Sequence, residues 1–158
     1  LVNNAAIFIG TPFEGITDTV WNATIDINLK GSFLTAQAVA PFMLKNKCGV
    51  IINIASLGGI QAWARHIPYS VAKAGVIMLT KCLAKSLSPF IRVNAIAPGT
   101  IIMEGEEDPT VRHISSKLIP LQRYGNASDI NELVVFLATS APYITGQTFV
   151  VDGGRSIQ

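Results

Sequence analysis

The feature that most constrains the fold of this chain is a nearly continuous run of apolar residues, CGVIINIAS, bounded by Gly49 and Ser56. Such a run is typical of a parallel β-strand that is covered on both faces. A second buried strand is expected at IRVNAIAPG, which ends at Pro98-Gly99. Two shorter strands are expected at LVNNA, at the start of the sequence, and at TFVVDGG, near its end.

The segments between these strands carry helical patterns. The sequence predicts one helix over about 19–46, bent or interrupted by Pro41, and another over about 69–88. A third covers NASDINELVVFLATS, with Ser128 as its N-terminal cap. Strands and helices that alternate in this way indicate right-handed crossovers and a parallel α/β sheet.

Composition excludes several classes of protein. The twelve Lys and Arg residues are scattered and the net charge is only +2, so nucleic acid is not an expected partner. Two cysteines and no Cys/His cluster predict free thiols in the cytoplasm and no metal site. Charged residues make up 14%, below the roughly 25% of soluble chains. We therefore expect extra buried surface, either in an oligomer or against a segment outside this sequence.

The longest uncharged stretch is LVVFLATSAPYITGQTFVV, of 19 residues. It contains Ser, Thr, Gln, Pro142 and Gly146, so a helix followed by a strand explains it better than a membrane span. No membrane partner is expected.

Polar or turn-forming residues follow three of the predicted strands. They are Asn3-Asn4-Ala5-Ala6, Ser56 and Pro98-Gly99. In an open parallel sheet, ligands bind outside the carboxyl ends of the strands. Tyr69 and Lys73 are one helical turn apart and follow Ser56 after a short loop, so we expect them at the same crevice.

A Tyr-x-x-x-Lys pair alone is more often structural, with a half-buried Tyr and a Lys that extends to solvent. Ser56, thirteen residues before Tyr69 and directly after a buried strand, favours a catalytic reading. The Tyr69 phenol has an ordinary pKa near 10, and a nearby ammonium would lower that pKa. Tyr69 could then exchange a proton with a carbonyl or alcohol, while Ser56 holds the oxygen.

Several motifs together resemble those of the short-chain dehydrogenases/reductases, in order and spacing. They are LVNNAA, INLKG, IINIAS, YSVAK, RVNAIAPG and YITGQTFVVDGG. The resemblance implies a Rossmann-type doubly wound parallel sheet with about four strands and flanking helices here. It also implies that Tyr69 is the acid/base, Ser56 orients the carbonyl, and Lys73 lowers the Tyr69 pKa and binds the nicotinamide ribose. Asn28 would hold a water of the proton relay; without the resemblance, it reads as a solvent-facing helix residue.

The resemblance also implies a nicotinamide cofactor, NADP or NAD, with NADP slightly favoured. Asn4 would lie against its adenosine side, with Asn3 supporting the strands. The residues after the third strand would border the nicotinamide. The predicted cofactor-binding residues are Asn4, Tyr69, Lys73, Pro98, Gly99 and Ile101. Gly99 has a second explanation, a turn that needs positive φ.

Three features depart from the family pattern. Met103 stands where members often carry a Thr, and Ala6 replaces the usual Gly. The glycine-rich phosphate-binding turn is absent, since the GG pairs at 58–59 and 153–154 follow the wrong elements. We therefore expect residues 1–158 to be a single partial NAD(P)-binding Rossmann domain that lacks its first three strands, with little activity alone. LVNNA would be left as an unpaired edge.

The expected function is hydride transfer between a nicotinamide and a small-molecule carbonyl or alcohol, or a pteridine-like substrate, in a homodimer or homotetramer. 3-Oxoacyl-carrier-protein reductases and pteridine reductases are the two nearest patterns. The alternative is a non-catalytic, oligomer-forming fragment or relative of the same fold.

Residues 98–123 are the expected substrate lid. Trp63, in the loop before the second helix, either lines the pocket or covers the core. His66, in the same loop, is expected to face solvent, with contact to the substrate as the alternative. Glu104, Glu106 and Glu107 read as a solvated face.

Overall fold

The protein is a four-stranded parallel sheet covered by helices on both faces, and the computed structural model describes residues 1–103, 105 and 115–157. The strand order is β1-β2-β3-β4. Their bounds are β1 Val2–Asn3, β2 Gly49–Ile54, β3 Ile91–Pro98 and β4 Thr148–Val151. The predicted α/β fold of Rossmann type, with four strands, is confirmed.

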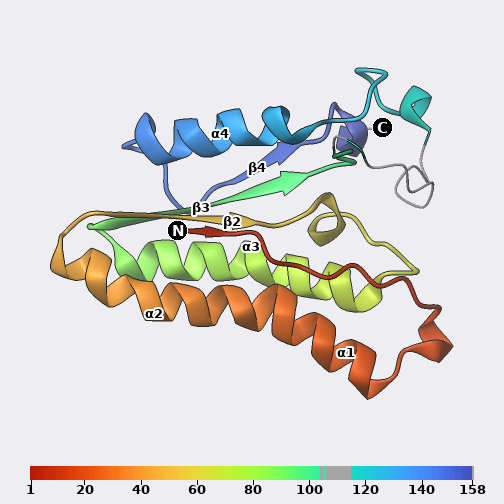
Figure 1. Cartoon of the computed structure of the whole chain (residues 1–158), viewed down its shortest axis with the longest axis horizontal. Helices are drawn as coiled ribbons and strands as arrows, with labels where there is room; N and C mark the ends of the chain where they lie inside the picture. The colour runs from red at the N-terminus through yellow and green to blue at the C-terminus, as the bar shows by residue number, and fades with distance from the viewer. Residues whose placement is uncertain (104, 106–114, 158) are drawn as a thin grey trace.

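Helices form one layer on each side of the sheet (Figure 1). The layer on one face contains α1, α2 and α3, and α4 lies on the other. Their bounds are α1 Asp18–Ile25, α2 Gly31–Lys45, α3 Ile67–Leu87 and α4 Ala127–Thr139. By length and composition α3 could cross a membrane, but it packs against β3 and a short 3₁₀ turn, η3 (Leu57–Gly59).

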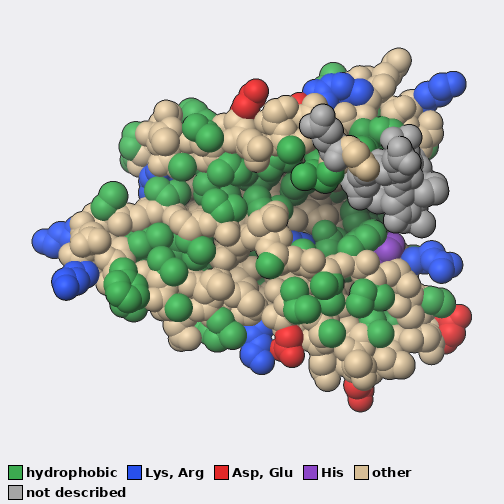
Figure 2. Space-filling view, viewed as in Figure 1, with side chains coloured by type: hydrophobic (Ala, Val, Ile, Leu, Met, Phe, Trp, Pro, Cys, Tyr) green, Lys and Arg blue, Asp and Glu red, His purple; other side chains and the backbone are tan. Residues whose placement is uncertain are grey.

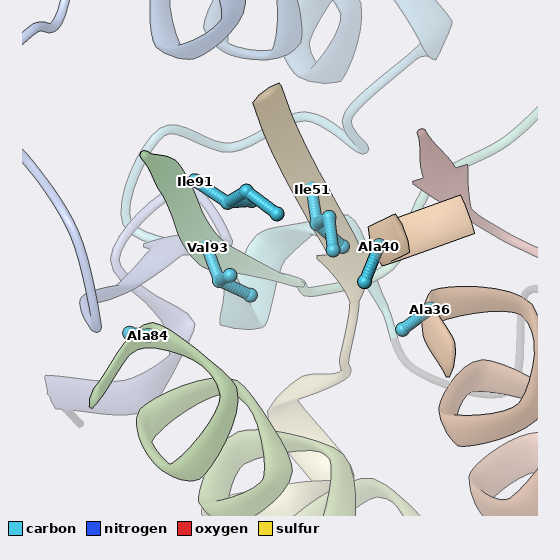
Figure 3. Packing of buried hydrophobic residues seen from close by; sticks show 6 residues of the cluster. All are labelled: Ala36, Ala40, Ile51, Ala84, Ile91 and Val93. Atoms are coloured by element: carbon cyan, nitrogen blue, oxygen red, sulfur yellow. The ribbon is translucent and has the colours of Figure 1, made fainter. Parts of the chain in front are cut away.

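Strand β2 divides the core between the two layers, because successive side chains point to opposite faces. Ile51 packs with Val93 and with alanines of α2 and α3, as Figure 3 shows. Ile52 packs instead with Leu137 of α4. Both isoleucines are at most 1% exposed. The unbroken apolar run seen in the sequence is therefore the signature of a strand with a helix layer on each side.

Two helix boundaries differ from the sequence prediction. The helix expected over 19–46 is irregular at Asp26–Lys30, a π-helical turn (η2) between α1 and α2, whereas Pro41 lies inside α2. α4 is capped by Asn126, whose side chain accepts from the backbone N–H of Ser128 and Asp129. The Asp129 carboxylate in turn accepts a hydrogen bond from the Asn126 N–H (2.8 Å), which completes a capping box. Ser128 is thus inside the helix and is not its cap.

A chain of hydrogen-bonded polar side chains, buried at Asn3, Asn53 and Thr80, ties strand β1 to its neighbours. Thr35 Oγ1 donates to Asn3 Oδ1 (2.7 Å), and Asn3 Nδ2 donates to Asn53 Oδ1 (2.8 Å). Asn53 Nδ2 then donates to Thr80 Oγ1 (2.8 Å). These bonds connect α2, β1, β2 and α3, so Asn3 supports the strands, as predicted. β1 pairs with β2 alone in the described chain, and its Val2 is 49% exposed.

The 3₁₀ turn η3 lies directly on the backbone of α3. A Cβ at Gly59 would be 2.7 Å from the carbonyl carbon of Lys73 and 2.8 Å from its oxygen. Only glycine permits this approach, since backbone atoms cannot move aside as a flexible side chain would. Gly59 therefore lets the turn after β2 lie against the first turns of α3.

Replacing Gly59 by Ala should lower the free energy of unfolding by about 1–3 kcal/mol, as overpacking does. Gly31→Ala is the matched control: its Cβ would meet the nearest atom, Asp26 O, at an ordinary 3.5 Å. In a helix, that change should stabilise by about 0.5–1 kcal/mol. Urea unfolding monitored by circular dichroism measures both; equal stabilities would contradict the packing argument.

Candidate functional site

The predicted cofactor residues line one cavity at the carboxyl ends of β1, β2 and β3. Its volume is about 640 Å³. It is lined by Asn4, Ser56, Tyr69, Lys73, Pro98, Gly99 and Ile101, together with apolar side chains that include Met103. The structure thus brings together every sequence-predicted site residue except Asn28.

A second cavity, also of about 640 Å³, adjoins the first. Ser56, Tyr69, Gly99 and Ile101 line both cavities. The second is otherwise lined by Phe8, Gly10, Trp63, Arg65, His66, Thr100 and Arg155. Ser56 and Tyr69 therefore lie at the boundary between the two cavities.

Ser56 is held by the turn that follows strand β2. It is 5% exposed, and its Oγ accepts a hydrogen bond from the Gly58 N–H at 3.1 Å. It is also the N-cap of η3, with extended backbone angles. Because η3 packs so closely on α3, Ser56 is fixed beside Tyr69 in the first turn of that helix.

The pKa of Tyr69 lies above its ordinary value, because the phenol is buried, and a hydrogen bond with the Ser56 side chain offsets part of this rise. The net direction of the Tyr69 pKa is therefore opposite to the lowering that the sequence predicted. Desolvation disfavours the charged phenolate and outweighs the neighbouring groups. Tyr69 is therefore a neutral hydrogen-bond donor near neutral pH.

Lys73 is a buried cation. It is 3% exposed, and its Nζ donates to the Ile54 carbonyl at 2.6 Å. The same Nζ lies 5.8 Å from the centre of the Tyr69 ring. Burial lowers the pKa of Lys73 to about 8. The ammonium thus keeps its charge at neutral pH, pointing toward the end of β2.

Asn28 lies in the π-helical turn η2 and is completely buried. Its Nδ2 donates to the carbonyls of Ile7 (3.0 Å) and Thr24 (2.9 Å), and its Oδ1 accepts from the Ile7 N–H (3.2 Å). The solvent-facing alternative is therefore wrong. The side chain fixes the segment after β1, and it does not line either cavity among the described residues.

Aromatic side chains form one wall of the second cavity. Phe8 stacks on His66 with ring centroids 4.0 Å apart, and Trp63 lies parallel to Tyr69 at 6.2 Å. His66 Nδ1 contacts the Ile9 carbonyl at 3.2 Å. Trp63 thus lines a pocket, and His66 faces the same space. Sequence reasoning missed Phe8, because nothing but its position soon after β1 marks it.

Close packing requires a glycine at position 99. It is not among the described glycines with positive φ, and a Cβ there would lie 2.7 Å from Asp152 Cβ. The turn explanation is therefore wrong, and the backbone after β3 can lie against the end of β4. Glu104, Glu106, Glu107 and most of the predicted lid lie outside the described residues.

Comparison with known proteins gives the same family as the motifs. The family model described as Enoyl-(Acyl carrier protein) reductase matches residues 1–156. A 3-oxoacyl-[acyl-carrier-protein] reductase of Synechocystis is 47% identical over 157 residues, which cover 98% of this chain and 63% of the relative. The chain thus spans less than two thirds of that relative's length.

Two solved structures also superpose closely. A gluconate 5-dehydrogenase from Burkholderia cenocepacia, in complex with NADP and tartrate, has a TM-score of 0.92 and 33% identity, covering 99% of this chain and 64% of its own. A 3-oxoacyl-[acyl-carrier protein] reductase from Brucella melitensis, with bound NAD, has a TM-score of 0.89 and 33% identity, covering 99% and 62%. With the family match along nearly its whole length, this chain belongs to the short-chain dehydrogenase/reductase family.

Proposed function

We propose that the protein is an NAD(P)-dependent oxidoreductase that reduces a carbonyl group and, in reverse, oxidises the alcohol. The observation that carries this proposal is the shared boundary of the two cavities, where Ser56 and Tyr69 face both. Two reactants held in adjoining compartments can meet across such a boundary. The relatives' names, which are those of reductases and dehydrogenases, agree with this reading.

The first cavity suits a nicotinamide cofactor. It combines apolar walls with a few polar groups, notably the exposed Asn4 and the Lys73 ammonium. When bound there, the cofactor would supply or accept the hydride. Asn4 would lie on its adenosine side, Lys73 at its ribose, and Pro98, Gly99 and Ile101 along the nicotinamide. Either NAD or NADP is compatible with these residues, and we favour NADP slightly.

Tyr69 acts as the general acid in this proposal. Its raised pKa keeps the phenol protonated, so it can give its proton to the carbonyl oxygen as the alcohol forms. The Ser56 hydroxyl hydrogen-bonds that oxygen and holds it in place. The resulting phenolate is stabilised by the Lys73 charge, whose Nζ lies near the ring.

Asn28 serves the proton relay through its backbone. Its side chain is already bonded to Ile7 and Thr24, so we assign the relay water to the main-chain carbonyl. That carbonyl accepts a long hydrogen bond from Ser32 Oγ (3.4 Å), and a carbonyl oxygen has two lone pairs.

The substrate would be a small carbonyl compound, with 3-oxoacyl thioesters first and pteridine-like compounds second. The Synechocystis relative supports this order. Oxidation of NADPH with acetoacetyl thioester or with a dihydropteridine would separate the two.

The protein would act in the cytoplasm as a homodimer or homotetramer. Exposed apolar side chains on α2 and α3 support such an assembly, among them Phe42 (71% exposed) and Met78 (57%). Figure 2 shows hydrophobic side chains spread over both helix layers. We also propose that residues 1–158 form a single partial Rossmann domain, with the free edge of β1 as the place where further strands would pair. A native mass equal to one chain would overturn the assembly.

Tyr69→Phe in the full-length protein should lower kcat about 10²–10⁴-fold, because it removes the proton donor and little else. Tyr143→Phe is the control, since Tyr143 is fully exposed and lines neither cavity. NADPH oxidation at saturating substrate measures both. Unchanged turnover in Tyr69→Phe would favour the non-catalytic, oligomer-forming alternative.

The burial of Lys73 should also be visible in stability without cofactor. Its pKa is about 8 when folded and about 10.4 when unfolded, so between these values the unfolded chain holds more protons. The free energy of unfolding should therefore rise by about 2 kcal/mol between about pH 7.5 and pH 9.5.

Urea titrations at the two pH values measure this rise in the wild type and in two variants. Lys73→Met should lose it, whereas Lys81→Met, on an exposed position of the same helix, should retain it. The same pH dependence in all three proteins would show that Lys73 is not the source.

A further inference from the structure

Arg155 is a cation of the second cavity that neither the family motifs nor the proposed proton transfer uses. It follows the GG pair at 153–154, both with positive φ (65° and 89°), which turns the chain back after β4. Only glycine adopts these angles at little cost. The turn brings the Arg155 side chain to the cavity that Ser56 and Tyr69 also line.

Two contacts with described residues hold the guanidinium, and they engage only one of its five N–H donors. Its NH1 group donates to Thr100 Oγ1 at 2.8 Å, and its Cζ lies 5.6 Å from the Trp63 ring centre. A guanidinium has five N–H donors in a flat fork, so a planar anion can still bind side-on. The cation–π contact with Trp63 and the bond to Thr100 hold the guanidinium in the cavity.

The charge of Arg155 has no carboxylate partner within the described part of the chain. Asp152 is the nearest acid, but its Oδ1 accepts from Gly154 N (2.9 Å) and its Oδ2 from Ser156 N (2.6 Å). No described Asp or Glu lines the second cavity, whereas Arg65 also lines it. Partial burial lowers the pKa of Arg155, and the charge of Asp152 offsets only part of this fall.

We propose that Arg155 determines substrate choice: the second cavity takes a carbonyl compound that carries a carboxylate, with Arg155 binding the carboxylate and Arg65 adding positive charge. The aromatic wall of Phe8, Trp63 and His66 would pack against the flat or apolar body between the two groups. This inference rests on the proposed oxidoreductase function. It adds a further class of substrate for the same site, ketones with a free carboxylate, to the thioester and pteridine-like candidates.

The test compares two ketones of the same shape, 4-acetylbenzoate and its neutral analogue 4-acetylbenzamide, with the full-length protein and NADPH. The measured quantity is the ratio of kcat/KM for the acid to kcat/KM for the amide. Arg155→Met should lower this ratio about tenfold or more, since a charge-assisted bidentate contact is lost. Arg155→Lys should give an intermediate ratio, because it keeps the charge but not the fork.

Lys117→Met is the matched control, since it removes one positive charge from an exposed site that lines neither cavity. It should leave the ratio unchanged. Turnover of the amide by wild-type protein would support the proposed function by itself; an equal ratio in wild type and Arg155→Met would then overturn only the role of Arg155.

If neither ketone is reduced, calorimetric binding of 4-acetylbenzoate decides the role of Arg155 independently of turnover. Binding to the wild type that Arg155→Met weakens about tenfold would support the carboxylate site. Absent or equal binding in the two proteins would overturn it.

Discussion

The contact between Lys73 Nζ and the Ile54 carbonyl joins the helix that carries Tyr69 to the strand that precedes Ser56. It places an ammonium where water is nearly absent, and a lone buried charge is costly. A pKa near 8 measures that cost, because the folded protein holds this proton less tightly than water-exposed lysine would. A buried charge with a strongly shifted pKa, located at the end of a parallel strand, is typical of a functional site.

The electrostatics of the two cavities are complementary to an anionic reactant on each side. Lys73 supplies positive charge to the first cavity, and Arg155 and Arg65 supply it to the second, while Tyr69 between them remains neutral. A neutral phenol flanked by cations can release its proton more easily than its burial alone would allow. Bound anions would change that balance, so the pKa of Tyr69 in this structure describes the protein before its reactants arrive.

Much of this arrangement could be predicted from the sequence. The runs around Ile51 and Val93 identify strands covered on both sides, and the polar residues at their ends identify the crevice. The sequence also predicted that Ser56, Tyr69 and Lys73 lie together, because helical spacing and strand ends are local features. The π-helical turn at Asn28 could not be predicted, because its cause is a tertiary contact: the Asn28 side chain bonds to Ile7, 21 residues away.

The sequence did not predict the direction of the Tyr69 pKa shift or the role of the glycines. Both depend on how closely separate elements approach each other. Sequence spacing placed Lys73 near Tyr69, but the burial of the phenol, which raises its pKa, depends on the tertiary packing around it. The GG pairs do not match a phosphate-binding turn, yet one lets η3 reach the helix and the other returns Arg155 to the cavity. The glycines at 58–59 and 153–154 therefore allow the close approaches that shape the two cavities. The side chains that line the cavities are positioned by these approaches.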